Sequence, residues 1–162
     1  MTIDINCDMG EAYSIYSCGD DEGIMPFITS ANVACGFHAS DPVVMHRTVK
    51  LAKAHGVKVG AHPSFPDRDG FGRRVMKMDR EELRDAVIYQ VAALKGFLDI
   101  EGMTLNHIKP HGALYGAAWT DEDVAIACAE AAQAFGVPMY GTTGTLHESV
   151  WPRYTEVKWE IF

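Results

Sequence analysis

Thr2-Ile-Asp-Ile-Asn-Cys-Asp8 alternates apolar and polar residues with the two-residue period of a β-strand. Val57-Lys-Val-Gly-Ala-His62 repeats this alternation, and a third run places His107, Lys109 and His111 on one face if it stays extended. Strands covered by helices on both faces of an open sheet are apolar on both sides. A polar stripe across several strands therefore predicts the interior of a barrel or a cleft.

Short apolar runs alternate with helical patterns along the whole chain, which is typical of βαβ units on a parallel sheet. The predicted strands are residues 2–7, 30–35, 57–61, 105–109, 137–142 and 156–162. Capping residues and apolar spacing predict three helices, which begin after Asp41-Pro42, at Asp79 and at a Thr120 cap. The first ends at Gly56 and the third at Gly136.

Two long polar segments, residues 10–26 and 63–78, are predicted to be irregular. Both follow the carboxyl end of a predicted strand, where the loops of parallel α/β folds build active sites. Four acid–base residues also fall at or just past strand ends, and a barrel would aim them at one mouth; they are Asp8, His38, His62 and His111.

Lys109 is expected to stabilise a developing oxyanion or to pair with Asp8, and it completes the predicted catalytic set. An arginine pair in the second polar segment is a candidate clamp for a carboxylate or phosphate. The predicted substrate-binding residues are Asn6, Glu11, Asn32, Arg73, Arg74 and His107.

Each of these residues also has a purely structural interpretation. A lone histidine near a strand end is more often structural than a ligand, and neighbouring loop arginines are usually solvated. His46 and His55 lie on helix patterns, and His147 has no strand-end placement. Asp20 and Asp21 either cap a turn at residues 21–25 or contact substrate. A divalent metal held by an aspartate and two histidines is a further alternative; its ligands would be Asp8, His62 and His111.

Composition excludes several classes of partner. The sequence has 14 Lys and Arg against 22 Asp and Glu, so its net charge of -8 disfavours nucleic acid. No apolar run reaches the roughly 20 residues of a membrane span, and Asp4 and Asp8 interrupt the position of a signal peptide. We therefore predict a cytoplasmic protein with reduced cysteines. The sequence contains no P-loop and no dinucleotide motif, and Gly-Thr-Thr-Gly at 141–144 is a weak phosphate-loop signal.

Five motifs in order closely resemble the LamB/YcsF family, the A subunits of bacterial ATP-dependent 5-oxoprolinase. They are Asn-Cys-Asp-Met-Gly-Glu (6–11), Thr-Ser-Ala-Asn-Val-Ala-Cys-Gly-Phe-His-Ala-Ser-Asp-Pro (29–42), Gly-Ala-His-Pro-Ser-Phe-Pro-Asp (60–67), Gly-Phe-Gly-Arg-Arg (70–74) and Lys-Pro-His-Gly-Ala-Leu-Tyr (109–115). The resemblance implies an irregular (β/α) barrel of about seven strands, related to glycoside hydrolase/deacetylase barrels. It also implies cleavage of 5-oxoproline to glutamate with ATP, in a complex with B and C subunits.

The resemblance also implies that family members continue past the position of Phe162, so residues 1–162 are expected to form one barrel domain that is incomplete at its C-terminal end. Val157, Trp159, Ile161 and Phe162 would then form an exposed apolar edge. Three hypotheses follow: a lactam hydrolase component, a metal-dependent deacetylase or amidohydrolase, and a non-enzymatic binding or assembly chain. The oligomeric state, including a homo-oligomer, stays open.

Overall fold

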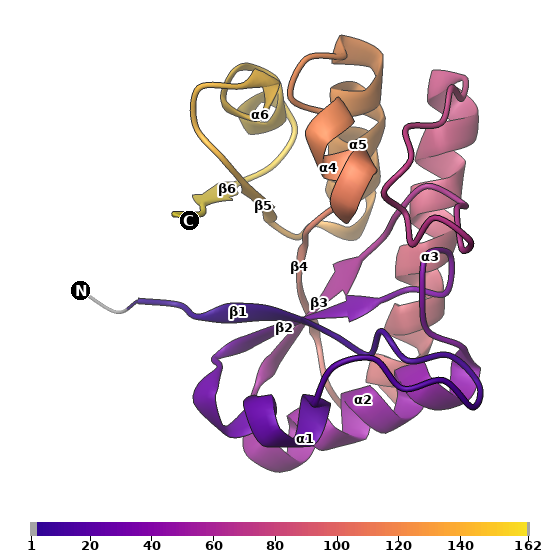
Figure 1. Ribbon diagram of the computed structural model, residues 1–162. Coiled ribbons are helices and arrows are strands. Elements are labelled where there is room, and N and C mark those ends of the chain that lie inside the picture. The colour runs from indigo at the N-terminus through magenta and orange to yellow at the C-terminus, as the bar shows by residue number, and fades with distance from the viewer. Residues whose placement is uncertain (1–2, 162) are drawn as a thin grey trace.

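Six parallel strands form one curled sheet in the computed structural model, which describes residues 3–161 (Figure 1). Spatial order follows chain order through β1 (Asn6–Met9), β2 (Ser30–Ala34), β3 (Lys58–His62), β4 (Leu105–Ile108), β5 (Met139–Gly141) and β6 (Val157–Trp159). Within the described residues β1 and β6 do not pair with each other, so the sheet is a half-barrel. The predicted α/β class is confirmed. Of the predicted barrel of about seven strands, the structure shows a half-barrel of six.

All six predicted strands are present, but their ends differ from the prediction. β1 begins at Asn6, which pairs with Ser30 at the start of β2. The N–H of the preceding residue, Ile5, donates to the Thr29 hydroxyl. β3 excludes Val57, whose N–H bonds to Ala52 in the turn that ends the preceding helix. β6 spans only the three residues that pair with the short β5. Thr2 and Phe162, at the outer ends of two predicted strands, lie outside the described residues.

The three predicted helices are α2 (Pro42–His55), α3 (Arg80–Ile100) and α5 (Glu122–Phe135). Asp41 and Asp79 cap the first two, as predicted, and Gly56 and Gly136 end α2 and α5. The prediction of a Thr120 cap is wrong. The adjacent Asp121 accepts the N–H groups of Asp123 and Val124, because a carboxylate one residue later reaches the free donors of the first turn.

The shorter elements lie in the segments that connect the strands. Residues 63–78 contain neither helix nor strand, as predicted, whereas residues 10–26 include one short α-helix and the start of a 3-10 helix. The short elements are α1 (Asp21–Ile24), η1 (Met25–Phe27), α4 (Gly112–Ala117), α6 (Leu146–Ser149) and η2 (Trp151–Arg153).

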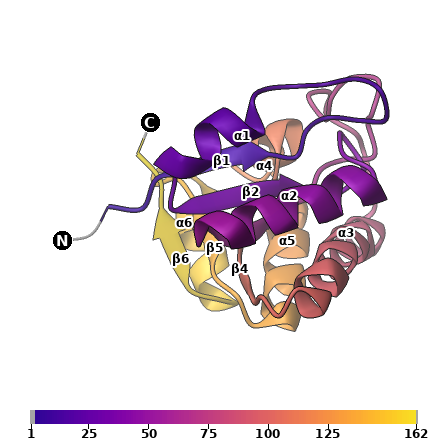
Figure 2. The ribbon, with the colours of Figure 1, turned by 90° about the horizontal axis from the view of Figure 1, so that it is seen from below.

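The two faces of the sheet differ in chemistry. Helices α2, α3 and α5 pack outside the curve and bury apolar strand residues such as Val33, Val59 and Ile108 (Figure 2). The inner face carries the predicted polar stripe, in which Asn32 of β2 bonds to Asn6 and Asp8 of β1. Curling of the sheet brings these polar residues together inside the half-barrel.

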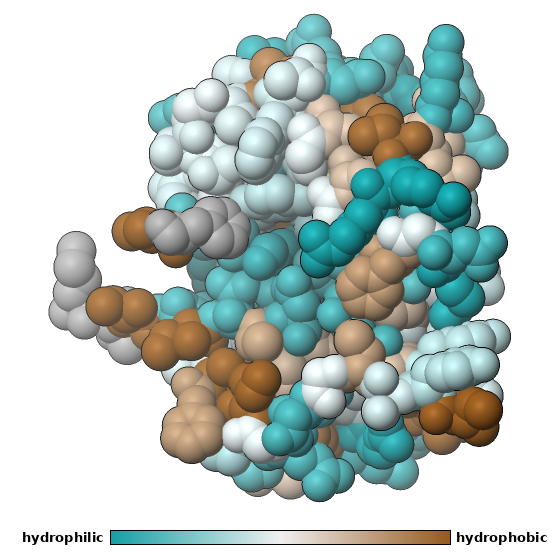
Figure 3. Space-filling model, in the orientation of Figure 1, coloured by the Kyte–Doolittle hydropathy of each residue, from teal (hydrophilic) through white to brown (hydrophobic). Residues whose placement is uncertain are grey.

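Apolar side chains flank the open side of the half-barrel, where the two ends of the chain approach (Figure 3). Ile3 and Ile5 are 80% and 53% exposed, and the predicted apolar edge is confirmed at Trp159 and Ile161. Among residues 3–161 no helix combines the length and apolar composition that a membrane crossing requires.

Candidate active site

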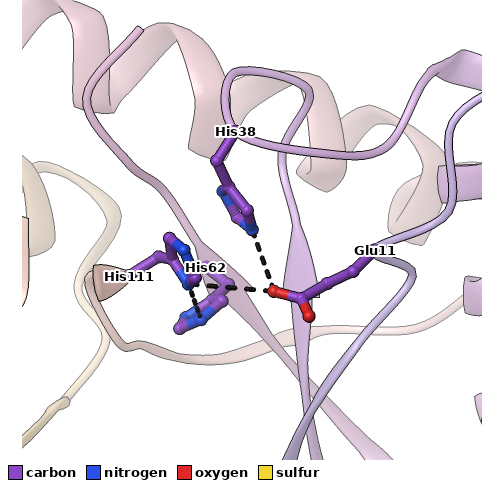
Figure 4. A group of neighbouring side chains, drawn as sticks. All are labelled: Glu11, His38, His62 and His111. Carbon is purple, nitrogen blue, oxygen red and sulfur yellow. Dashed lines mark hydrogen bonds and ion pairs between the residues drawn. The ribbon is translucent and has the colours of Figure 1, made fainter. Parts of the chain in front are cut away.

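Four side chains converge where the first four strands end: Glu11, His38, His62 and His111 (Figure 4). Glu11 follows β1, His38 follows β2, His62 ends β3 and His111 follows β4. One ligand-type atom from each lies within 4.8 Å of the others, and the three histidines are almost fully buried. The structure thus brings together the three strand-end histidines and adds Glu11, which the sequence suggested only as a substrate-binding residue.

Backbone carbonyls fix two of these rings. His62 Nδ1 lies 2.7 Å from the Lys109 carbonyl oxygen, and His111 Nε2 lies 2.8 Å from the Phe71 carbonyl oxygen. A carbonyl can only accept, so these ring nitrogens carry hydrogen. The remaining nitrogens, His62 Nε2 and His111 Nδ1, face each other at 3.0 Å. Gly72 and Gly112, both with positive φ, let the 63–78 loop approach closely enough to supply the Phe71 carbonyl.

Glu11 and His38 form the other half of the cluster. His38 Nε2 lies 3.1 Å from Glu11 Oε1, and its ring stacks on His111 at 3.7 Å between centroids. Burial, reinforced by the charge of His62 when protonated, lowers the pKa of His38 to about 3 and that of His111 to about 4. Burial also raises the pKa of Glu11, against the opposing effect of the His62 and His111 charges.

Asp8 lies at the edge of the cluster, with its side chain 39% exposed. Its Oδ1 is 3.4 Å from His62 Nε2, 3.7 Å from Lys109 Nζ and 2.8 Å from Asn32 Nδ2. Burial acts to raise the pKa of Asp8, but the His62 charge and hydrogen bond, with Lys109 and Asn32, hold it well below its usual range. Asp8 is therefore an ionised, partly accessible carboxylate beside a buried histidine.

Lys109 forms a closer ion pair than the one predicted with Asp8. Its Nζ lies 3.0 Å from Glu160 Oε1, closer than to Asp8, and the Glu160 side chain is only 6% exposed. Glu160 also accepts from Asn6 Nδ2 at 3.1 Å and from the Tyr115 hydroxyl at 3.0 Å. Neither Glu160 nor Tyr115 was predicted as a site residue. Two features of the sequence could have indicated them. Tyr115 lies inside the motif at residues 109–115, and Glu160 has the same strand parity as Lys158, opposite to the apolar Val157 and Trp159.

The two arginines have different positions. Arg74 donates through Nε and Nη2 to Asp67, which also accepts the Gly70 N–H, so this pair holds the 63–78 loop together. Arg73 has an exposed side chain. Burial is the largest influence on the pKa values of Glu11 and His38, raising the first and lowering the second, and the charge of Arg73 lowers both. Of these two arginines, Arg73 is therefore the candidate for contact with a ligand at the cluster.

The donor set suits a divalent cation, because imidazole nitrogens and a carboxylate are ligands that Zn²⁺ accepts. The 3.0 Å between His62 and His111 and the 3.7 Å between His111 and Glu11 fit the edges of one coordination sphere. His38 does not fit with His111, because the rings are nearly parallel, at 7°. An ion in the plane of one ring lies well outside the plane of the other. The described residues thus offer His62 and His111 with Glu11 or Asp8, which agrees with the predicted trio on the two histidines.

Structural roles account for most other polar residues that the sequence singled out. Asp20 caps α1 by accepting from Gly23, whereas Asp21 accepts the Gly10 N–H and does not cap. His46 pairs with Glu101 at 2.9 Å and stacks on Phe97. His55 is exposed.

The loop at residues 141–144 is poorly suited to a phosphate. The Thr142 N–H donates to His147 Nδ1, and the Gly144 N–H donates to the Glu148 carboxylate, whose charge repels anions. The helix that follows, α6, has only four residues. The weak phosphate-loop signal is therefore not supported by the geometry.

Comparison with known proteins matches residues 3–155 to the LamB/YcsF family. The lactam utilization protein lamB of Emericella nidulans is 55% identical over 141 residues, which cover 87% of this chain and 55% of that protein. The A subunit of 5-oxoprolinase from Bacillus licheniformis is 55% identical over 129 residues, covering 80% of this chain and 51% of that protein. The chain thus spans about half the length of the curated relatives it matches.

A solved structure shows the same fold. The crystal structure of a lactam utilization protein from Thermus thermophilus superposes with a TM-score of 0.98 at 47% identity. The match covers all of this chain and 67% of that one. With the family match over nearly its full length, the chain belongs to the LamB/YcsF family.

Proposed function

We propose that this chain is the hydrolytic component of an ATP-dependent 5-oxoprolinase, which opens the lactam of 5-oxoproline to L-glutamate. The observation that carries the proposal is the buried His62–His111 pair flanked by Asp8 and Lys109 at the strand ends. Relatives about 55% identical, named as A subunits of 5-oxoprolinase, supply the substrate class. ATP belongs in this proposal to the assembled complex with B and C subunits, and no nucleotide site is assigned to this chain.

Lactam opening adds water to the carbonyl carbon, breaks the carbon–nitrogen bond and leaves a proton on the nitrogen. Amide resonance makes this slow unless the oxygen is activated by phosphorylation or its negative charge is stabilised. Asp8 or His62 would take the proton from water, because Asp8 lies at the accessible edge of the cluster and its carboxylate is 3.4 Å from His62 Nε2. Lys109 and a histidine would stabilise the charge on oxygen, and Arg73 would hold the substrate carboxylate.

The same proposal includes the finer features implied by the family. The half-barrel would be part of a single barrel domain of about seven strands, in a cytoplasmic protein. The match covers only 51–55% of the relatives, whose remaining length would supply further strands.

Reconstitution tests the proposal. The full chain is combined with its B and C subunits, and conversion of 5-oxoproline to glutamate is measured with ATP present. We expect Asp8→Ala and His62→Ala each to lower kcat by roughly 100-fold or more, the usual size of a general acid–base contribution. His55→Ala, on the exposed end of α2, is the control. Full turnover in both site variants would show that the proposed function is wrong.

The donor set of the cluster supports a second candidate, a metal-dependent amidohydrolase acting alone. A bound Zn²⁺ supplies a Lewis acid and an activated water in such enzymes. Metal analysis separates the two candidates. A stoichiometric ion that is needed for amide cleavage without B, C or ATP supports the second, and turnover that survives complete chelation excludes it.

A further inference from the structure

A buried chain of hydrogen bonds leads from β4 to Asp8 along the inner face of the sheet. His107 Nε2 lies 2.6 Å from Asn32 Oδ1. Asn32 Nδ2 in turn donates to Asp8 Oδ1 at 2.8 Å and to Asn6 Oδ1 at 2.7 Å. His107 and Asn32 are both fully buried. Three strands therefore contribute to one connected polar path that ends on the carboxylate.

The direction of every bond in this path follows from Asp8. An ionised carboxylate only accepts, so the NH₂ group of Asn32 must face it. The oxygen of Asn32 is then turned to His107, whose Nε2 must carry hydrogen. His107 Nδ1 is left as an acceptor, and Asn106 Nδ2 lies 2.9 Å away to donate to it. The path has one self-consistent arrangement.

The surroundings hold the His107 ring in place. Tyr140 stacks on it at 3.8 Å with a 7° interplanar angle. On the other side is Gly60, where an added Cβ would lie 2.2 Å from the ring. A ring confined between an aromatic face and a glycine backbone cannot turn toward a ligand in the mouth of the half-barrel.

These contacts leave His107 and Asn32 little capacity to bind substrate. Both nitrogens of His107 are engaged, as are both hydrogens and the oxygen of Asn32. Neither side chain is accessible, whereas Asp8 is. Both residues had been expected from the sequence to contact substrate, and their burial argues against that role.

We propose that Asn32 and His107 are positioning residues, which hold the Asp8 carboxylate in its working orientation instead of binding substrate. The inference rests on the proposed function, in which Asp8 acts in lactam hydrolysis. Under this inference, Asn32 and His107 contribute to the reaction without touching the reacting atoms. Asn32 fixes the rotation of the carboxylate, and His107 fixes the orientation of the Asn32 amide.

A matched pair of variants tests this role in the reconstituted complex. His107→Phe keeps the stacking but removes the donor, and His107→Gln keeps a side-chain N–H. We expect His107→Phe to lower kcat roughly 10- to 100-fold with KM changed less than about threefold, because the lost interaction acts on Asp8 and not on bound substrate. His107→Gln should recover much of the loss. Asn32→Ala should resemble His107→Phe or exceed it.

A readout independent of activity accompanies the kinetics. Nitrogen-15 NMR of histidine-labelled protein should show His107 as the Nε2–H tautomer, and circular dichroism with thermal melts should confirm that each variant is folded. If His107→Phe does not fold, His107→Gln and Asn32→Ala carry the test.

The outcomes are distinguishable. A rise in KM with kcat preserved, full activity in Asn32→Ala, or the opposite tautomer would overturn the positioning role while leaving the proposed function intact. Full activity in Asp8→Ala would instead remove the proposed function itself.

Discussion

His62 Nε2 and His111 Nδ1 face each other at 3.0 Å, while the other nitrogen of each ring is bound to a backbone carbonyl. With one proton on each ring, two lone pairs would point at one another, which is electrostatically unfavourable. A cation or a shared proton between the two nitrogens removes this repulsion. Asp8 and Glu11, at 3.4 and 3.7 Å from the facing nitrogens, stabilise positive charge there.

This geometry predicts which histidines bind a divalent ion. We expect added Zn²⁺ to raise the Tm of the wild-type chain by about 5–10 °C at a concentration near 100 times Kd, the size expected from ligand linkage. His111→Asn should abolish the rise, because it removes one of the two facing nitrogens. His38→Asn should retain it, because the His38 ring is stacked on His111 and cannot share an ion with it.

Scanning fluorimetry with and without Zn²⁺ checks this prediction, and elemental analysis gives the stoichiometry. His55→Asn replaces an exposed histidine and serves as a control for nonspecific binding. Loss of the thermal shift in His38→Asn but not in His111→Asn would contradict the geometric assignment.

Gly60 and Gly96 provide a matched pair of glycine substitutions. A Cβ at Gly60 would lie 2.2 Å from the His107 ring, whereas nothing lies within 4 Å of one at Gly96. We expect Gly60→Ala to destabilise the fold by roughly 1–3 kcal/mol, as overpacking does. Gly96→Ala, on the exposed side of α3, should stabilise it by about 0.5–1 kcal/mol through helix propensity. Urea denaturation measures both, and equal stability of the two variants would contradict the packing described for His107.

Sequence alternation predicted the inner polar face because side-chain direction along a strand follows from parity alone. Asp8, His62 and His111 meet for this reason. The Lys109–Glu160 ion pair could not be predicted in the same way. It depends on how far the sheet curls, which is a property of all six strands together.

Local ambiguity explains the smaller errors. Thr120 and Asp121 are adjacent residues with good capping side chains, and only the path of the preceding turn selects Asp121. Arg73 and Arg74 are likewise indistinguishable in sequence. Their roles separate only because Asp67 lies within reach of one of them.

The separation of the two arginines predicts different defects. Arg73→Gln should raise KM for 5-oxoproline roughly 10- to 100-fold, since a hydrogen bond to a charged group contributes about 1.5–3 kcal/mol. Arg74→Gln should leave KM nearly unchanged and instead loosen the loop at residues 63–78, because Arg74 is held by Asp67. Kinetics of the reconstituted complex and limited proteolysis of the loop distinguish the two effects. A similar rise in KM for both variants would show that the arginines act together.

His147 predicts how stability depends on pH. It is fully buried, its Nδ1 accepts the Thr142 N–H, and its ring stacks on Trp151 at 3.6 Å. Burial, partly offset by the Tyr115 backbone, lowers the pKa of His147 to about 4. In the unfolded chain a histidine has a pKa of about 6.5. Between these values only the unfolded chain binds the proton, so this contribution to stability is complete above pH 6.5 and is lost as the pH falls toward 4.

The substitution His147→Asn isolates this effect, because asparagine offers Thr142 an acceptor but does not titrate. Wild-type unfolding free energy should fall with decreasing pH more steeply than that of the variant, by at most about 1.4 kcal/mol per pH unit between pH 6.5 and 4. His55→Asn is the matched control, since its ring is exposed to water before and after unfolding. Urea denaturation at several pH values gives the slopes. Identical slopes for wild type and His147→Asn would mean that the folded protein accepts a proton at His147. The packing against Trp151 argues against this, because a buried imidazolium there would lack a charged partner among the described residues.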